Sequence, residues 1–175
     1  MTVTIFMNMS ADGFIAKEDN SVPFISDEEW KVYVGTAQKS DALIVGRHTY
    51  DEMIKAGDFN EIGTPRTIVV TQNDQLTSPS ENVFFSSESP ENIIYALNKE
   101  GLKNILVCGG AQINALFLKE KCVNKINICI SPYLLGGGIP FLKEDKCETD
   151  LSLESFEKIG NGSVLLKYKI ENHNV

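Results

Sequence analysis

The stretch ILVCGGAQINALFLKE, residues 105–120, passes from an apolar run through two glycines into a helix-like pattern. The run predicts an interior strand, and the apolar spacing that follows predicts a helix over 111–120. Gly109 and Gly110 therefore lie where a strand delivers the chain to a helix N-terminus, with unpaired backbone N–H groups and the positive end of the helix dipole. Such a place suits a phosphate held on bare backbone, or a tight turn that binds nothing. The dipeptide alone leaves both interpretations open.

The remaining segments alternate between strands and helices. Ser26 and Glu29 form a capping box that starts one helix, and Ser89 with Gly101 brackets another. The segment 155–170 predicts an antiparallel hairpin around an Asn-Gly turn. Apolar and β-branched runs predict strands over about 2–9, 41–46, 66–71, 82–85, 104–108 and 125–131. This order predicts an α/β protein with a mixed, mostly parallel sheet flanked by helices.

Composition narrows the classes of protein. A chain of 175 residues with 42% hydrophobic residues is expected to form one domain over 1–175. A net charge of −8 without a Lys/Arg cluster argues against nucleic-acid binding. There is neither a membrane-length apolar run nor a signal-peptide pattern, so we expect a cytoplasmic protein that does not enter a membrane. The four cysteines lack CxxC spacing and only two histidines accompany them, so we expect no metal site and no disulfides.

A second strand-to-helix junction lies in VGRHTYDEM, residues 45–53. A strand ends at Gly46, and Arg47, His48 and Thr49 then open a helix, which adds a guanidinium to a second set of backbone donors. Two such junctions suit a diphosphate. Neither GxGxxG nor GxxxxGK[ST] occurs, so the pattern supports neither a Rossmann site nor a P-loop.

Four motifs together, NMSADGFIA (8–16), VGRHTY (45–50), ILVCGGAQIN (105–114) and YLLGGGIPFL (133–142), resemble the dihydrofolate reductase-like superfamily. The likeness is greatest to the reductase domain of the bifunctional riboflavin-biosynthesis deaminase/reductase and its stand-alone bacterial relatives. The resemblance implies a three-layer α/β/α sandwich with NADPH across the carboxyl ends of the strands. It also implies a cis peptide bond between Gly109 and Gly110, and often a homodimer.

The resemblance also assigns cofactor-binding residues by position. In chain order these are Met9, Gly13 and Ile15 beside the nicotinamide, Gly46, Arg47 and Thr49 on the adenosine side, Thr71 and Gln72 near the ribose, and Gly109, Gly110, Ala111, Gln112 and Ile113 around the diphosphate. The segment VVTQNDQ (69–75) contains no Arg or Lys to meet a 2′-phosphate. The choice of NADPH over NADH therefore rests on the family and on Arg47.

The acidic residues at the start of the first helix are candidates for the reacting end of the site. Asp27 precedes Trp30 by three residues and Val34 by seven, so the helical spacing predicts that its carboxylate faces inward. This spacing resembles the pteridine-anchoring Asp and nearby Trp of dihydrofolate reductases. We predict that Asp27, with Glu28 as its substitute, binds the heterocycle or relays the proton, and that Asp12 is a second candidate. An Asp in a first turn also commonly just complements the helix dipole.

The resemblance predicts an NADPH-dependent reductase of a pyrimidine- or pterin-like heterocycle, most closely a 5-amino-6-(5-phosphoribosylamino)uracil reductase. One departure concerns the run MIKAGDFNEIGTP (53–65), where riboflavin reductases usually carry an Asp-Asp-Pro-x-Leu-Thr-like segment. Basic residues that would grip a ribose phosphate are not evident. Dihydrofolate reductase is the alternative enzyme, favoured by Asp27 and Trp30, and a nucleotide-binding protein without catalysis is the third possibility.

Overall fold

A computed structural model describes residues 1–175 except 64, 74–75, 144–146, 161 and 172–175. The strands are β1 (Thr2–Ser10), β2 (Phe14–Ala16), β3 (Ala42–Gly46), β4 (Arg66–Val70), β5 (Val83–Ser86), β6 (Asn104–Val107), β7 (Lys125–Ser131), β8 (Ile139–Pro140), β9 (Leu151–Ile159) and β10 (Ser163–Ile170). The helices are α1 (Asp27–Ala37), α2 (Arg47–Ala56), α3 (Phe59–Ile62), α4 (Pro90–Lys99) and α5 (Ala111–Lys119).

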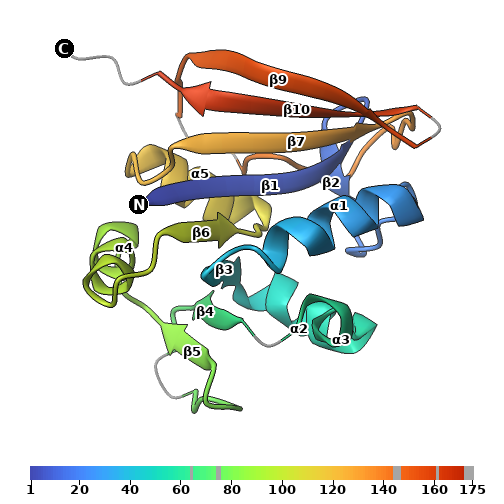
Figure 1. Cartoon of the computed structure of the whole chain (residues 1–175). Helices are drawn as coiled ribbons and strands as arrows, with labels where there is room; N and C mark the ends of the chain where they lie inside the picture. The colour runs from blue at the N-terminus through green and yellow to red at the C-terminus, as the bar shows by residue number, and fades with distance from the viewer. Residues whose placement is uncertain (64, 74–75, 144–146, 161, 172–175) are drawn as a thin grey trace.

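Eight of these strands form one twisted sheet in the order β5-β4-β3-β6-β1-β7-β10-β9 (Figure 1). Neighbouring strands from β5 to β7 are parallel, whereas β10 runs antiparallel to β7 and to β9. The predicted mixed sheet with a C-terminal antiparallel hairpin is therefore confirmed. Asn161 of the predicted Asn-Gly turn lies outside the described residues.

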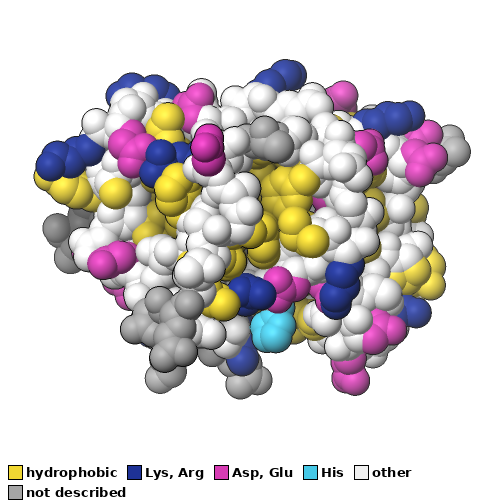
Figure 2. All heavy atoms as spheres, turned by 90° about the horizontal axis from the view of Figure 1, so that it is seen from below, with side chains coloured by type: hydrophobic (Ala, Val, Ile, Leu, Met, Phe, Trp, Pro, Cys, Tyr) yellow, Lys and Arg dark blue, Asp and Glu magenta, His cyan; other side chains and the backbone are white. Residues whose placement is uncertain are grey.

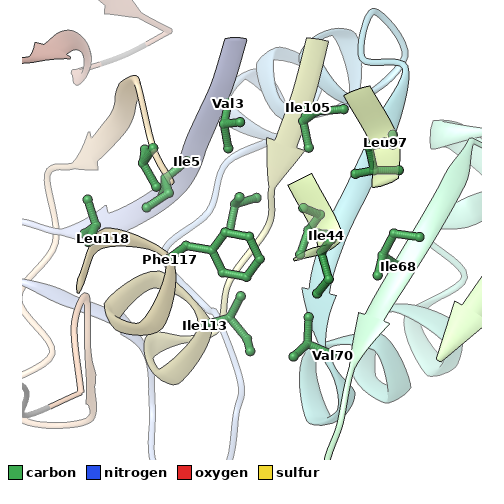
Figure 3. Close-up of a cluster of buried hydrophobic side chains, with 14 of the residues drawn as sticks. Val3, Ile5, Ile44, Ile68, Val70, Leu97, Ile105, Ile113, Phe117 and Leu118 are labelled. Atoms are coloured by element: carbon green, nitrogen blue, oxygen red, sulfur yellow. The ribbon is translucent and has the colours of Figure 1, made fainter. Parts of the chain in front are cut away.

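Helices cover both faces of the sheet, which confirms the three layers. On one face α4 and α5 pack on the strands, and Phe117 of α5 points into the middle of the cluster (Figure 3). Burial of a phenylalanine of this kind stabilises the fold by about 1.5–3 kcal/mol. On the other face Tyr33 of α1, Tyr50 of α2 and Ile62 of α3 pack on the sheet.

Local sequence signals begin and end the helices where they were expected. The Ser26 hydroxyl accepts a hydrogen bond from the Glu29 N–H, and the Glu29 carboxylate accepts one from the Ser26 N–H, so the capping box is confirmed. Ser89 caps α4, and Gly101 follows its end with a φ of +85°, a conformation that favours glycine.

Strand β5 forms the lower edge of the sheet in Figure 1. Its Phe84 is 37% exposed, and the Arg66 guanidinium lies 4.4 Å from the ring centroid. Seen from below, apolar side chains are exposed in the middle of the molecule, among charged side chains of both signs (Figure 2). Charge next to an exposed strand edge disfavours pairing with another chain.

Three short elements were not predicted. Strand β2 lies within the expected loop 10–25 and pairs with β8 in a separate two-stranded sheet. Helix α3 follows α2. Each spans four residues or fewer, too few for a periodic pattern to be visible. Within the described ranges, we find no helix with the length and apolar character needed to span a bilayer.

Candidate functional site

The carboxyl ends of β3 and β6 meet at two glycines. The sheet register pairs Ile44 with Val107, and two residues later the Gly46 N–H donates a 2.8 Å hydrogen bond to the Gly109 carbonyl. The Gly109–Gly110 peptide bond is cis, as predicted. The two strand-to-helix junctions that lie 63 positions apart in the sequence are thus side by side in the fold.

Side chains have little room at these glycines. Gly109 has a φ of +85°, which other residues rarely adopt. The nearest atoms to a Cβ built on each glycine are Ile113 Cγ1 at 2.8 Å for Gly46, Met7 Sδ at 3.0 Å for Gly109, and Thr49 Oγ1 at 3.1 Å for Gly110. The backbone therefore stays bare at this edge of the sheet, and we call Gly46, Gly109 and Gly110 the glycine cradle.

Helices α2 and α5 both begin at this cradle. Their N-cap residues, Gly46 and Gly110, provide no side-chain hydrogen bond, and neither first turn carries an acidic residue. By contrast, α1 has three acidic residues in its first turn. First-turn N–H groups and two positive dipole ends are consequently left for an anion. Two neighbouring ends of this kind can together hold a diphosphate.

Arg47 extends the site toward β5. Its Nε donates to both carboxylate oxygens of Asp51 at 2.9 Å, and its guanidinium carbon lies 5.2 Å from the centroid of the Phe85 ring. The Thr71 N–H donates to the Ser86 carbonyl at 2.9 Å, which holds the start of the segment after β4 against β5. Gln72 is exposed beside Thr71. The structure thus brings Arg47, Thr71 and Gln72 to the carboxyl ends of adjacent strands.

The other predicted cofactor residues lie around the ends of β1 and β6. Met9 is partly buried at the end of β1, Ile15 is buried in β2, and Gly13 lies between them with a φ of +93° and open space beside its Cα. In the first turn of α5, Ala111 and Ile113 are buried, whereas Gln112 is exposed. In this turn, Gln112 is therefore the side chain that a bound molecule could reach from the solvent.

The prediction that Asp27 faces inward is wrong. Asp27 and Glu28 are exposed, and the buried carboxylate of α1 is Glu29, which is 1% exposed. The buried stripe of α1 consists of Glu29, Tyr33 and Ala37, four residues apart, and Asp27 does not belong to it. The capping-box pattern in the sequence marks Glu29 as a helix start, and it carries no signal that this side chain is buried.

Glu29 joins α1 to the sheet. One carboxylate oxygen accepts hydrogen bonds from the Ser131 hydroxyl and, at 3.7 Å, the Cys129 thiol, and the other accepts the Ser26 N–H at 2.8 Å. Burial acts to raise the pKa of Glu29, but hydrogen bonds from Ser131, Ser26 and Ser163 outweigh it and hold that pKa below its usual range. Glu29 is therefore ionised at neutral pH.

The Asp12 carboxylate accepts three hydrogen bonds from within the protein. The Ser10 hydroxyl donates to it at 2.6 Å, and the backbone N–H groups of Leu135 and Gly136 donate at 3.1 and 2.7 Å. The Ser10 bond chiefly, with the two backbone bonds, lowers the pKa of Asp12 to about 2. A group that stays ionised at neutral pH does not suit the proton-donor role predicted for Asp12, and it instead ties the end of β1 to the glycine-rich segment.

Aromatic rings line the face of the sheet beside Glu29. The Tyr33 ring centroid lies 5.6 Å from that of Phe6 and 5.3 Å from that of Trp30. The Tyr33 hydroxyl also bonds the buried Cys108 thiol, and burial raises the pKa of Cys108 to about 12. Because nucleophilic cysteines need a thiolate, Cys108 is not suited to that chemistry. Phe6, Tyr33 and Glu29 are buried in this layer, and Trp30 is the partly exposed ring beside them.

Comparisons with known proteins agree with this architecture. The protein named "Uncharacterized protein YwjB" from Bacillus subtilis (strain 168) is 30% identical over 173 residues, covering 94% of this chain and 95% of that protein. A putative riboflavin biosynthesis protein from Shewanella sp. PV-4 superposes with a TM-score of 0.82 at 25% identity, over 98% of this chain and 100% of the other.

The deaminase/5-amino-6-(5-phosphoribosylamino)uracil reductase from Thermotoga maritima shares the fold, with a TM-score of 0.76 at 18% identity, over 97% of this chain and 56% of that one. The family model described as the RibD C-terminal domain matches residues 1–165. On this match, the chain belongs to the RibD C-terminal domain family.

Proposed function

We propose that this protein is a reductase that uses NADPH to reduce a pyrimidine- or pterin-like heterocycle. The observation that carries the proposal is the junction of α2 and α5, whose glycine N-caps are linked by the hydrogen bond between Gly46 and Gly109. Bare backbone and two helix N-termini at one sheet edge fit the diphosphate of a dinucleotide. Membership of the RibD C-terminal family supports an oxidoreductase.

The residues present fit the parts of the cofactor. Gly110 and the first turn of α5 would hold the diphosphate, because a side chain on Gly110 would meet Thr49. Arg47 would meet the adenosine side, and Met9 would lie beside the nicotinamide. When bound, the cofactor supplies the hydride, while the protein must orient the two reactants and exclude water.

The substrate would lie on the sheet face that α1 covers. The partly exposed ring of Trp30, which packs on Tyr33, would support a heterocycle there. The resemblance favours 5-amino-6-(5-phosphoribosylamino)uracil, the substrate in the name of the Thermotoga maritima protein. Dihydrofolate is the second candidate, since a carboxylate near the start of α1 does face inward, although it belongs to Glu29.

Two measurements on purified protein test the proposal. Titration with NADPH, followed by nicotinamide fluorescence, should show saturable binding. Addition of 5-amino-6-(5-phosphoribosylamino)uracil or of dihydrofolate should then oxidise the cofactor, seen as loss of its absorbance. Binding without turnover on either compound would favour the non-catalytic alternative, and no binding of NADPH or NADH at millimolar concentration would refute the proposal.

A further inference from the structure

Two asparagines beside the glycine cradle have buried side-chain oxygens without a hydrogen-bond partner: Asn8 in β1 and Asn114 in α5. The Asn114 amide nitrogen donates to the Phe141 carbonyl at 3.1 Å, so that side chain is held within the protein. Among the described residues, the Asn8 side chain makes no hydrogen bond at all, although Asn8 is only 7% exposed. A buried carbonyl oxygen that has lost its water needs another donor.

The register of the sheet places Asn8 on the face that α1 covers. Side chains alternate along β1, so Asn8 shares the face of Phe6, which packs against Tyr33 of α1. Its partner position in β7 is Cys129, which belongs to the same layer. The Asn8 carboxamide therefore lies between the sheet and the start of α1.

Asn8 also lies level with the glycine cradle. The residue before it, Met7, has its sulfur 3.0 Å from a Cβ built on Gly109. Met7 itself faces the other side of β1, so the Asn8 backbone lies level with the cradle while its carboxamide is on the face that α1 covers. A ring carried by a dinucleotide at the cradle and a second ring on the α1 face would meet at this point.

The polar groups near Asn8 are already paired with one another. Glu29 accepts hydrogen bonds from Ser131, Cys129 and the Ser26 backbone. The Ser131 hydroxyl and the Cys129 thiol are thus directed to the Glu29 carboxylate, and the Ser10 hydroxyl on the same side of β1 donates to Asp12, so these donors do not reach the Asn8 oxygen. The donor that Asn8 lacks can come from a bound molecule.

We propose that Asn8 is a substrate-binding residue whose Oδ1 accepts a hydrogen bond from an N–H group on the edge of a nitrogen heterocycle. This proposal rests on the proposed function. The ligand class is a flat ring with a ring N–H or an exocyclic amine, which aminopyrimidines and pterins share. Trp30, partly exposed and packed on Tyr33, supplies the apolar surface for the ring, and Asn8 selects its hydrogen-bonding edge.

The test replaces Asn8 with leucine, which has a similar shape and no polar atom. If the oxygen has no partner in the free protein, Asn8→Leu should raise the unfolding temperature by about 2–4 °C. Calorimetry should be used to measure the dissociation constants of 5-amino-6-(5-phosphoribosylamino)uracil and dihydrofolate. For the compound that binds, the dissociation constant should rise about tenfold in Asn8→Leu. The NADPH dissociation constant should change less than twofold.

Asn127→Leu is the matched control, because Asn127 lies on the same face of the neighbouring strand, opposite Phe6, and lines an open groove. It should leave heterocycle binding unchanged. If Asn8→Leu fails to fold, Asn8→Ala serves for the same binding measurement.

The outcomes separate this proposal from the proposed function. Unchanged heterocycle affinity in Asn8→Leu would overturn the role of Asn8, even where NADPH oxidation by the wild type continues. A lower unfolding temperature with unchanged affinity would identify an internal water or other structural partner, and would overturn it too. Wild-type protein that binds neither heterocycle also contradicts it. Conversely, the protein could bind the heterocycle in a way that depends on Asn8 but bind no NADPH. That result would refute the proposed reductase function and support the Asn8 contact.

Discussion

Replacement of Arg47 by glutamine should remove most of the preference for NADPH over NADH. Arg47 opens α2 at the cradle, and the residues that follow β4, 71–73, include no basic side chain. A guanidinium bonded to a phosphate contributes about 1.5–3 kcal/mol. The Arg47 side chain is 36% exposed and already paired with Asp51. Because solvent and this carboxylate compete with the phosphate, the contribution of Arg47 to binding should lie near the lower end of that range. About 1.5 kcal/mol corresponds to roughly a tenfold loss of NADPH affinity.

The assay is a fluorescence titration of both cofactors against three proteins: wild type, Arg47→Gln and Lys55→Gln. Lys55 lies at the other end of α2 and is 70% exposed, so its replacement makes the same change in net charge far from the cradle. NADPH affinity should fall in Arg47→Gln alone, NADH affinity should stay nearly constant, and the difference should shrink as salt rises. An unchanged ratio of the two dissociation constants in Arg47→Gln would refute the assignment of Arg47 to the 2′-phosphate.

Four further predictions concern stability, the cradle and assembly. Glu29→Gln should lower the free energy of unfolding by about 2 kcal/mol at pH 7, because hydrogen bonds to a charged group are lost. Since the pKa of Glu29 is lowered in the native state, the difference in unfolding free energy between wild type and variant should shrink in urea titrations below pH 4. A difference that stays constant with pH would contradict this prediction. Burial, with the nearby Glu61 charge, raises the pKa of Asp58 to about 6, so the native state binds more protons than the unfolded state between about pH 4 and 6 and loses stability as pH rises. Asp58→Asn should therefore raise the unfolding temperature at pH 8 but hardly at pH 4, and equal gains at both would exclude this cause. Gly110→Ala should weaken NADPH binding about tenfold with a smaller effect on the unfolding temperature, and retained affinity would argue against a diphosphate at the cradle. Sedimentation velocity should show the homodimer expected from the family resemblance, and a monomer at micromolar concentration would contradict it.

The glycine cradle could be predicted from the sequence to a large extent. Strand runs, the capping box at Ser26 and the glycines at the ends of β3 and β6 are signals within a few residues of one another. Local backbone preferences decide such features. The succession of strands and helices along the chain, and the two glycine junctions, can therefore be derived from the sequence alone. The resemblance added the cis bond at Gly109–Gly110, which the structure confirms.

The buried polar groups on the face that α1 covers required the tertiary structure. The helical spacing of Asp27 and Trp30 predicted an inward Asp27, whereas the buried carboxylate is Glu29, because the side of α1 that meets the sheet is set by tertiary packing. The hydrogen bond between Glu29 and Ser131 joins residues 102 positions apart, and the unpaired oxygen of Asn8 can be recognised only once its neighbours on α1 and β7 are placed. A periodic pattern reports which residues share one face of a single element, whereas a polar pocket depends on elements that the chain brings together from distant positions.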